Sequence, residues 1–216
     1  MCVSTNNSFC FRSGRRFNTH CTELKTVSGG FIKWANCCRY LGVFINTGFT
    51  FKCNFDNAKS CFFKAFNAMY SKVGRLASEE VVLSLIRVKC LPILLYATEA
   101  CPLLSRNRNS LEFTVNRLFM KLFHTASPAV VQRCQPAFNF LPITSQLDIS
   151  IAKCLQECIA SENRVCNFFS LTARHQLDEL FIHYDNVTTA YQLNSAILDS
   201  FACSNILSPA VSLNIV

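Results

Sequence analysis

All six glycines of the chain lie between Gly14 and Gly74, so the long remainder of the chain has none. Glycine supplies the backbone conformations of tight turns and bulges that other residues avoid. We therefore expect a turn-rich N-terminal part, followed by a long and mainly helical remainder.

Charged residues are also scarce, at 16% of the chain, whereas half of the residues are hydrophobic. This balance excludes wholesale disorder. The first residues lack the basic start and apolar run of a signal peptide. The longest apolar run, Leu91–Ala97, is far shorter than the roughly 20 residues of a membrane-spanning helix. We expect an intracellular protein, cytoplasmic or nuclear, with no membrane partner.

Acidic residues are few and scattered, so no two-metal catalytic site stands out. No serine has the glycine neighbours of a nucleophile elbow, and no glycine-rich loop is present to hold phosphates. A cysteine paired in space with a histidine stays open, because sequence does not show such a pair. That cysteine-based enzyme would need a thiol of lowered pKa beside a histidine.

Fourteen cysteines are present in a chain that has neither the small size nor the secretion signal of disulfide-rich domains. We expect them to be reduced and mostly buried, as free cysteine commonly is. Cys154 and Cys158 lie one helical turn apart, with Cys166 and His175 further on. Zinc ligand pairs usually have two to five intervening residues. The gap from Cys166 to His175 is longer, so we expect no zinc site.

Charge is distributed unevenly along the chain. Residues 1–140 hold 18 Lys and Arg against 6 Asp and Glu, a net of +12, and residues 141–216 hold 3 against 7, a net of −4. A basic segment of this kind is typical of a protein that binds a polyanion. The alternative is a soluble basic surface with no such role.

Apolar spacing predicts helices from Asp56 onward. The first has Asp56 as its N-cap and Gly74 as its stop, and the second begins at a Ser78 cap and ends or kinks near Pro92. Further helices are expected over Asn109–Phe123, Ser145–Ala160, His175–His183 and Thr189–Phe201, with Pro128, Pro136 and Pro142 interrupting the chain between the first two of these.

The N-terminal part has the composition of short strands. A turn at Ser28–Gly30 is expected to join two of them, the second including Phe31–Trp34, and a further strand is expected over Arg39–Ile45.

Lysines and arginines accompany two of the predicted helices. Each is a candidate for neutralising a phosphate, which would give salt-sensitive binding independent of base sequence. The alternative for each is an ordinary solvated helix face. The candidates are Lys59, Lys64, Lys72 and Arg75, which flank the apolar stripe of the first helix, and Arg106, Arg108, Arg117 and Lys121, which accompany the helix expected over Asn109–Phe123.

Three blocks, Arg39–Ile45, Phe62–Arg75 and Lys89–Pro102, follow one another in an order that resembles a known family. They resemble the region after the catalytic palm in reverse transcriptases of non-LTR (LINE-type, jockey-like) retrotransposons of animals. The resemblance spans about Gly30–Phe140, and continues more weakly through Gln176–Phe181 and Tyr184–Val187. It implies that Tyr40, Leu41 and Gly42 lie in the primer grip, and that the helices after them form a thumb on an RNA–DNA hybrid.

The chain departs from that family where the chemistry should be. The palm box of an aromatic residue, any residue and two aspartates is missing, since no two aspartates are adjacent. The lysine of the late palm motif is also absent near Asn7 and Ser8. The resemblance therefore implies a truncated or decayed copy. The Mg²⁺ of the intact family would lack its ligands here, and a palm would have to be supplied in trans.

We therefore expect a mainly α protein, a helical thumb-like domain with a small N-terminal β hairpin. Residues 1–54 would be a palm remnant with the primer-grip hairpin, residues 55–160 the helical thumb-like domain and residues 161–216 an acidic helical tail. The expected role is to hold primer and template for RNA-directed DNA synthesis without catalysis. The alternative is a non-catalytic helical protein-interaction module or an inert retroelement relic.

Overall fold

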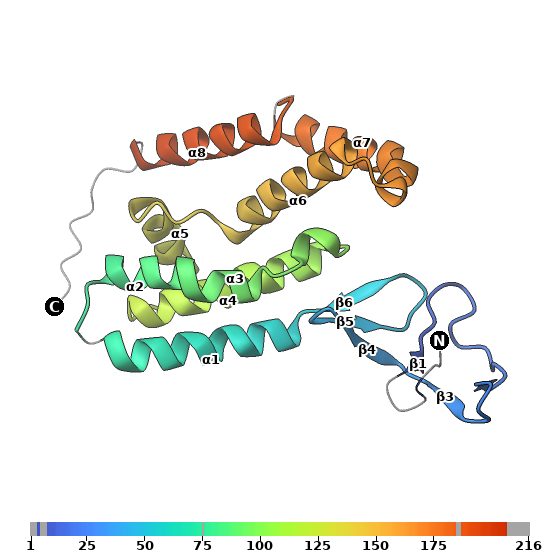
Figure 1. Cartoon of the computed structure of the whole chain (residues 1–216). Coiled ribbons are helices and arrows are strands. Elements are labelled where there is room, and N and C mark those ends of the chain that lie inside the picture. Colours follow the sequence, from blue (N-terminus) through green and yellow to red (C-terminus); the bar gives the residue numbers. More distant parts are fainter. Residues whose placement is uncertain (1–3, 5–7, 75, 185–186, 207–216) are drawn as a thin grey trace. The chain divides into compact units, whose positions relative to one another are not determined.

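In the computed structural model the chain is mainly helical, with small sheets confined to its N-terminal part, as predicted (Figure 1). The structure describes residue 4 and residues 8–74, 76–184 and 187–206, without the side chains of 203–206. The chain divides into two compact units, Met1–Cys61 and Phe62–Val216. The functional segments 1–54, 55–160 and 161–216 stay predictions.

The first sheet of the N-terminal unit has the order β1-β3-β2. Strand β1 (Phe9–Cys10) runs parallel to β3 (Phe31–Trp34), and β2 (Leu24–Lys25) runs antiparallel to β3. Gly29 has a φ of +84° in the turn between β2 and β3, a conformation that suits glycine. The strands expected on either side of Ser28–Gly30 are therefore confirmed.

The second sheet is antiparallel and contains β4 (Cys37–Tyr40), β5 (Val43–Asn46) and β6 (Lys52–Asn54). The prediction of one strand over Arg39–Ile45 is wrong. Leu41 and Gly42 have φ values of +46° and +85°, and they form a two-residue turn between the paired residues Tyr40 and Val43. Two successive positive φ values are typical of the turn that suits the twist of a tight hairpin.

Helix α1 (Asp56–Val73) ends just before Gly74, as predicted, and buries Phe62 and Phe66. Its start differs in detail from the expected Asp56 cap. The side chain of Asn54 accepts a hydrogen bond from the Asp56 backbone N–H at 2.7 Å, so Asn54 satisfies one of the exposed donors of the first turn.

The next helical stretch contains a wide turn. Helix α2 (Glu79–Leu85) leads into a π-helical turn, η1 (Ile86–Cys90), and then into α3 (Leu91–Leu94), so the kink predicted near Pro92 is present. Four fully buried residues recur at every fourth position across it: Val82, Ile86, Cys90 and Leu94.

This four-residue spacing explains the π turn. In a regular α-helix, four residues advance about 40° beyond one full turn, so a stripe with this spacing drifts around the helix. A π turn holds more residues per revolution and offsets the drift. It also ends two residues before Pro92, which lacks the N–H of a regular helical bond.

A short 3₁₀ turn, η2 (Thr98–Ala100), precedes helix α4 (Ser105–Leu122), which buries the predicted stripe of Leu111, Val115, Leu118 and Leu122. Helix α5 (Pro128–Ala137) was missed because its prolines were interpreted as breaks. Pro128 opens the helix, where a missing N–H costs nothing, and Pro136 lies in its last turn. Helix α6 (Ile143–Ala160) begins two residues before the predicted Ser145.

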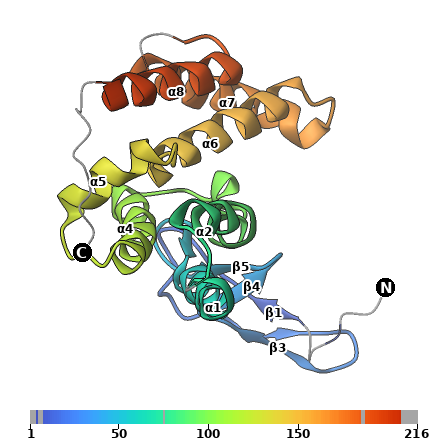
Figure 2. The same cartoon turned by 90° about the vertical axis from the view of Figure 1, so that its left-hand side faces the viewer.

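Helices α7 (Arg164–His183) and α8 (Ala190–Ile206) lie beside α6 in both views (Figures 1 and 2). Helix α7 begins far earlier than the expected His175, after Asn163, whose side chain accepts from the Val165 N–H at 2.8 Å. The three helices share a hydrophobic core of Ile149, Ala152, Leu177, Phe181, Ala190, Leu193 and Ile197.

By length and composition alone, the stretch Glu79–Ala100 is apolar enough to cross a membrane, and 39% of its most apolar window is buried within the protein. Helices at the core of soluble proteins pass the same test, and Val82, Ile86, Cys90 and Leu94 are core residues here. The expected absence of a membrane partner stays a prediction.

Candidate nucleic-acid interface

Two of the predicted basic residues meet α1 at its junction with α4. Lys121 on α4 donates a hydrogen bond from Nζ to Oδ1 of Asn67 on α1 at 3.0 Å. Arg117 lies one turn earlier on α4 and so shares a helix face with Lys121. We call this junction the basic seam, formed by Phe63, Asn67 and Tyr70 of α1 with Arg117 and Lys121 of α4.

Both cations of the basic seam lie over aromatic rings of α1. The guanidinium of Arg117 is 5.7 Å from the ring centre of Phe63. The ammonium of Lys121 is 5.3 Å from the ring centre of Phe66 and 5.4 Å from that of Tyr70. Such contacts are worth about 0.5–1 kcal/mol at exposed sites. They restrict two long side chains, although both residues are exposed overall.

The partners of these cations were not singled out from the sequence. Phe63, Phe66 and Tyr70 recur at intervals of three and four, and Phe66 and Tyr70 stack with ring centres 5.2 Å apart. The signal was present in this spacing, but pairing it with residues some fifty positions later requires the packing of α1 against α4, which sequence alone does not give.

The other predicted lysines on α1 differ in their surroundings. Lys64 follows Phe63 in the helix and is exposed, and Lys72 is exposed in the last turn. Lys59 forms an ion pair with Asp56 at 2.7 Å, within the N-terminal unit. Arg75 lies outside the described residues. Of the basic residues predicted on α1, Lys64 is therefore the one that directly follows a residue of the basic seam, Phe63.

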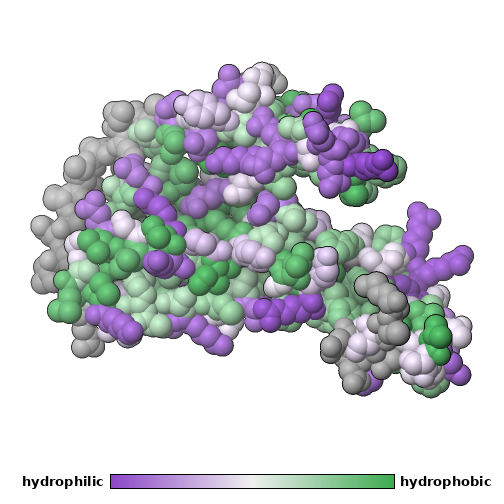
Figure 3. All heavy atoms as spheres, in the orientation of Figure 1, coloured by the Kyte–Doolittle hydropathy of each residue, from purple (hydrophilic) through white to green (hydrophobic). Residues whose placement is uncertain are grey.

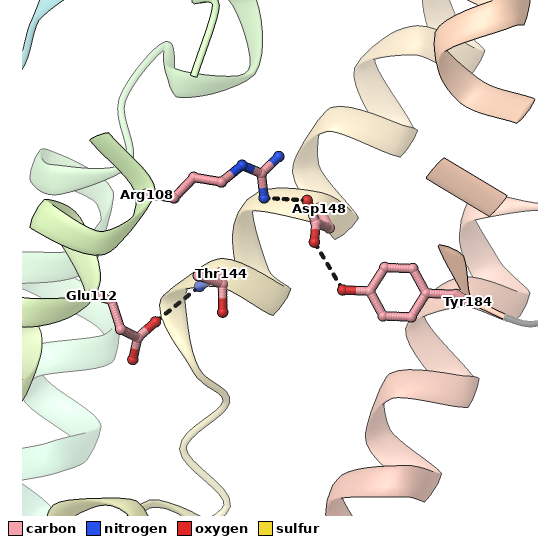
Figure 4. Close-up of polar contacts among 5 residues, drawn as sticks. All are labelled: Arg108, Glu112, Thr144, Asp148 and Tyr184. Carbon is pink, nitrogen blue, oxygen red and sulfur yellow. Dashed lines mark hydrogen bonds and ion pairs between the residues drawn. The ribbon is translucent and has the colours of Figure 1, made fainter. Parts of the chain in front are cut away.

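Arg106 and Arg108, both at the start of α4, have different roles. Arg106 is exposed, whereas Arg108 is half-buried and donates from Nη1 to Oδ1 of Asp148 at 2.5 Å. Oδ2 of Asp148 accepts from the hydroxyl of Tyr184 at 2.8 Å, and the two contacts link α4, α6 and α7 (Figure 4). Arg108 thus has an acidic partner within the chain, which favours a structural role.

A second contact in Figure 4 supports the same packing. The carboxylate of Glu112 on α4 accepts from the backbone N–H of Thr144 in the first turn of α6, at 3.0 Å. A negative charge at a helix N-terminus is favourable because the first N–H groups of a helix lack internal partners. Glu112, the sole acidic residue in the α4 sequence, is therefore directed to α6.

Tyr40, Leu41 and Gly42, the predicted primer-grip residues, form the tip of the β4–β5 hairpin in the N-terminal unit. All three are exposed. The structure therefore presents them to solvent on a turn, with Gly42 in a conformation that a residue with a Cβ would adopt at a cost.

The described part of the chain brings together no cluster of metal-ligating side chains, and burial shifts three of its thiols away from reactivity. Its His, Cys, Asp and Glu residues form no group of three or more that could hold a metal ion, and the expected lack of Mg²⁺ ligands stays a prediction. Burial raises the pKa of the thiols of Cys90, Cys134 and Cys154. A cysteine nucleophile needs the opposite shift.

Hydrophobic side chains are also exposed over α2 and α3 (Figure 3). Val81, Val88 and Ile93 are among them. They lie on the same helical stretch as the buried stripe but outside it, which leaves an apolar surface of the kind that protein partners cover.

No family model matches this chain, and neither the curated proteins nor the solved structures compared with it include a match.

Proposed function

We propose that the chain is a reverse-transcriptase-derived protein that has lost its catalytic aspartates and binds the backbone of an RNA–DNA hybrid through the basic seam. The observation that carries this proposal is the placement of Arg117 and Lys121. Each is an exposed residue whose charged group lies over an aromatic ring of the neighbouring helix. The resemblance of the sequence to a non-LTR thumb supports the same role.

Phosphate binding follows from the chemistry of these two side chains. Arg presents a planar set of N–H donors that suits phosphate, and Lys supplies a compact positive charge. Because the aromatic rings already restrict both side chains, less conformational entropy is lost when a phosphate binds. Lys64 extends the basic surface on α1, whereas Arg108 is omitted because Asp148 already neutralises it.

Such contacts would recognise the duplex by shape. Double-stranded nucleic acid of A-like form is bound mainly through phosphates and the wide minor groove, with little reading of bases. The proposed role is therefore to hold primer and template, and polymerisation would need a palm from another chain.

The test is a binding titration of the full chain with a labelled RNA–DNA hybrid across a salt series. Affinity should fall log-linearly with salt, and removing two phosphate contacts should flatten the slope by about 1.8, at roughly 0.9 per contact. The variant is Arg117→Ala with Lys121→Ala. Its matched control is Lys153→Ala with Arg174→Ala, which removes the same charge from exposed positions on α6 and α7.

An equal loss of affinity in both double variants would mean that net charge alone drives binding. A folded chain that does not bind the hybrid at low salt would reject the proposal outright.

The second candidate function, a protein-interaction module, is favoured by the exposed apolar side chains over α2 and α3. Apolar association does not weaken as salt rises, so the same series separates the two functions. Val88→Asp should abolish such an association and leave binding of the hybrid unchanged.

A further inference from the structure

One face of the β1-β3-β2 sheet combines aromatic rings and lysines. Phe9 pairs with Lys33, and Phe31 pairs with Lys25, in the two registers of the sheet. Paired residues point to the same face, and residues two apart on one strand share it too. Phe9, Lys25, Phe31 and Lys33 therefore lie on one face, which we call the Phe–Lys face.

The Phe–Lys face is open to solvent. Phe9 is 45% exposed and Phe31 49%, and both lysines are exposed. The ammonium of Lys25 is 4.9 Å from the ring centre of Phe31, so cation and ring are neighbours across the strands. The opposite face carries Cys10 and Ile32, which are half-buried, and also Leu24 and Trp34, which are exposed.

The charge of the N-terminal unit indicates what covers this face. Its sequence contains the acidic residues Glu23 and Asp56, and Asp56 is paired with Lys59. The same unit contains eight basic residues: Arg12, Arg15, Arg16, Lys25, Lys33, Arg39, Lys52 and Lys59. An apolar protein partner would have to desolvate Lys25 and Lys33, which is costly without acidic groups opposite them. A polyanion with flat apolar groups satisfies both the lysines and the rings.

We propose that the Phe–Lys face binds single-stranded nucleic acid, with bases stacked on Phe9 and Phe31 and phosphates bound by Lys25 and Lys33. Surfaces that bind single strands combine a positive surface with aromatic rings, because every base has a π face. A duplex hides those faces by pairing and stacking its own bases. This site is therefore separate in residues and in ligand from the basic seam, and it does not depend on the function proposed above.

The first test compares two probes of equal length and charge, a labelled oligo(dT) and an abasic phosphodiester chain. The full chain should bind oligo(dT) more tightly, and Phe9→Ala with Phe31→Ala should weaken that binding by about tenfold or more, given the usual strength of base–aromatic stacking. Binding of the abasic chain should not change. Phe49→Ala, at another exposed phenylalanine of the same unit, is the matched control and should leave both affinities unchanged.

A second readout reports the stacking directly. Trp34 is the one tryptophan of the chain. In a Trp34→Phe, Phe31→Trp variant, a base stacked at position 31 should quench the emission, and the abasic chain should leave it unchanged. Circular dichroism of each variant checks that it is folded.

Three results would overturn the proposal. The first is equal affinity for oligo(dT) and the abasic chain. The second is an unchanged oligo(dT) affinity in a folded Phe9→Ala, Phe31→Ala variant. The third is binding to anionic lipid vesicles that needs both phenylalanines, with no oligo(dT) binding. In the Arg117→Ala, Lys121→Ala background, oligo(dT) binding should persist while binding of the hybrid is lost, so the two proposals succeed or fail separately.

Discussion

Arg108 on α4 and Asp148 on α6 form a close ion pair, with Nη1 and Oδ1 2.5 Å apart, although forty residues separate them in sequence. Asp148 is only 6% exposed, and its other oxygen accepts from Tyr184. A buried carboxylate is tolerated where it is paired and hydrogen-bonded. One of the arginines predicted to bind phosphate is thus part of the packing between helices.

Replacing Arg108 with methionine should leave the Asp148 charge buried without its cation. Removing one partner of a buried pair costs about 3 kcal/mol or more. We expect a loss near the lower end of that range in the free energy of unfolding in urea, because Arg108 is partly exposed. Arg106→Met, an exposed position on the same helix, should change stability by less than about 0.5 kcal/mol. Similar losses in both variants would argue against a structural role for Arg108.

Tyr184→Phe should remove the second hydrogen bond of Asp148, at a cost of about 1.5–3 kcal/mol for a bond to a charged group. Burial, reinforced by the hydrogen bond to Asp148, raises the pKa of Tyr184 above its ordinary value. The folded state therefore keeps the phenol protonated where the unfolded chain releases its proton.

The stability that this raised pKa contributes should be complete below about pH 10, the ordinary tyrosine pKa, and should fall as pH rises above it. Urea unfolding at pH 8 and at about pH 11 should show a larger alkaline loss for the native chain than for Tyr184→Phe. Equal losses of unfolding free energy in the two proteins would mean that Tyr184 does not contribute to the alkaline loss of stability.

Phe119→Ala should be among the most damaging single changes in α4. Phe119 is fully buried and packs edge-on against Phe140, with ring centres 4.9 Å apart. Truncation of such a ring costs about 3–5 kcal/mol. Phe113→Ala, on the same helix but 56% exposed, should cost far less in the same urea experiment. An equal loss of stability in the two variants would argue against a core position for Phe119.

Gly74→Ala should destabilise the end of α1, although alanine usually favours helices. A Cβ at Gly74 would overlap the ring of Tyr70, which stacks on Phe66 and lies beside Lys121. The ring must move, so we expect a loss of about 1 kcal/mol, comparable with other small overpacking changes.

The same substitution in a Tyr70→Ser background should be neutral or stabilising, since the obstructing ring is gone. This double-mutant cycle isolates the contact between positions 70 and 74. A stabilising Gly74→Ala in the native chain would contradict the packing of Tyr70.

The helical character of the chain and the apolar stripe of α4 were predictable, because both depend on local composition and spacing. The turn at Leu41–Gly42 was not, because leucine rarely adopts a positive φ and the flanking β-branched and aromatic residues resemble one strand. The first half of α7 was missed because exposed apolar residues, such as Phe168 and Leu171, obscure its amphipathic pattern.

Within the candidate interface, the sequence predicted Arg117 and Lys121 but not their aromatic partners. The sequence also did not show that Arg117 and Arg108 have different surroundings, since both are arginines on one helix. They differ in their partners, which are distant in sequence: Arg108 pairs with Asp148, and Arg117 lies over Phe63. Such pairing depends on tertiary packing, which no local pattern encodes.

The π turn at Ile86–Cys90 takes up one residue more than a regular α-helix would hold there. Deleting one residue in this turn would let the stretch continue as a regular α-helix, and the residues after it would keep nearly the same orientation relative to α2, because the extra residue and the wide turn disappear together. Leu91 and Leu94 would therefore stay in the core. A one-residue deletion in the middle of the regular helix α4 would instead rotate its remainder by about 100° and turn Leu118 and Leu122 away from the core. Single-residue deletions should therefore be tolerated better in the π turn than within α4.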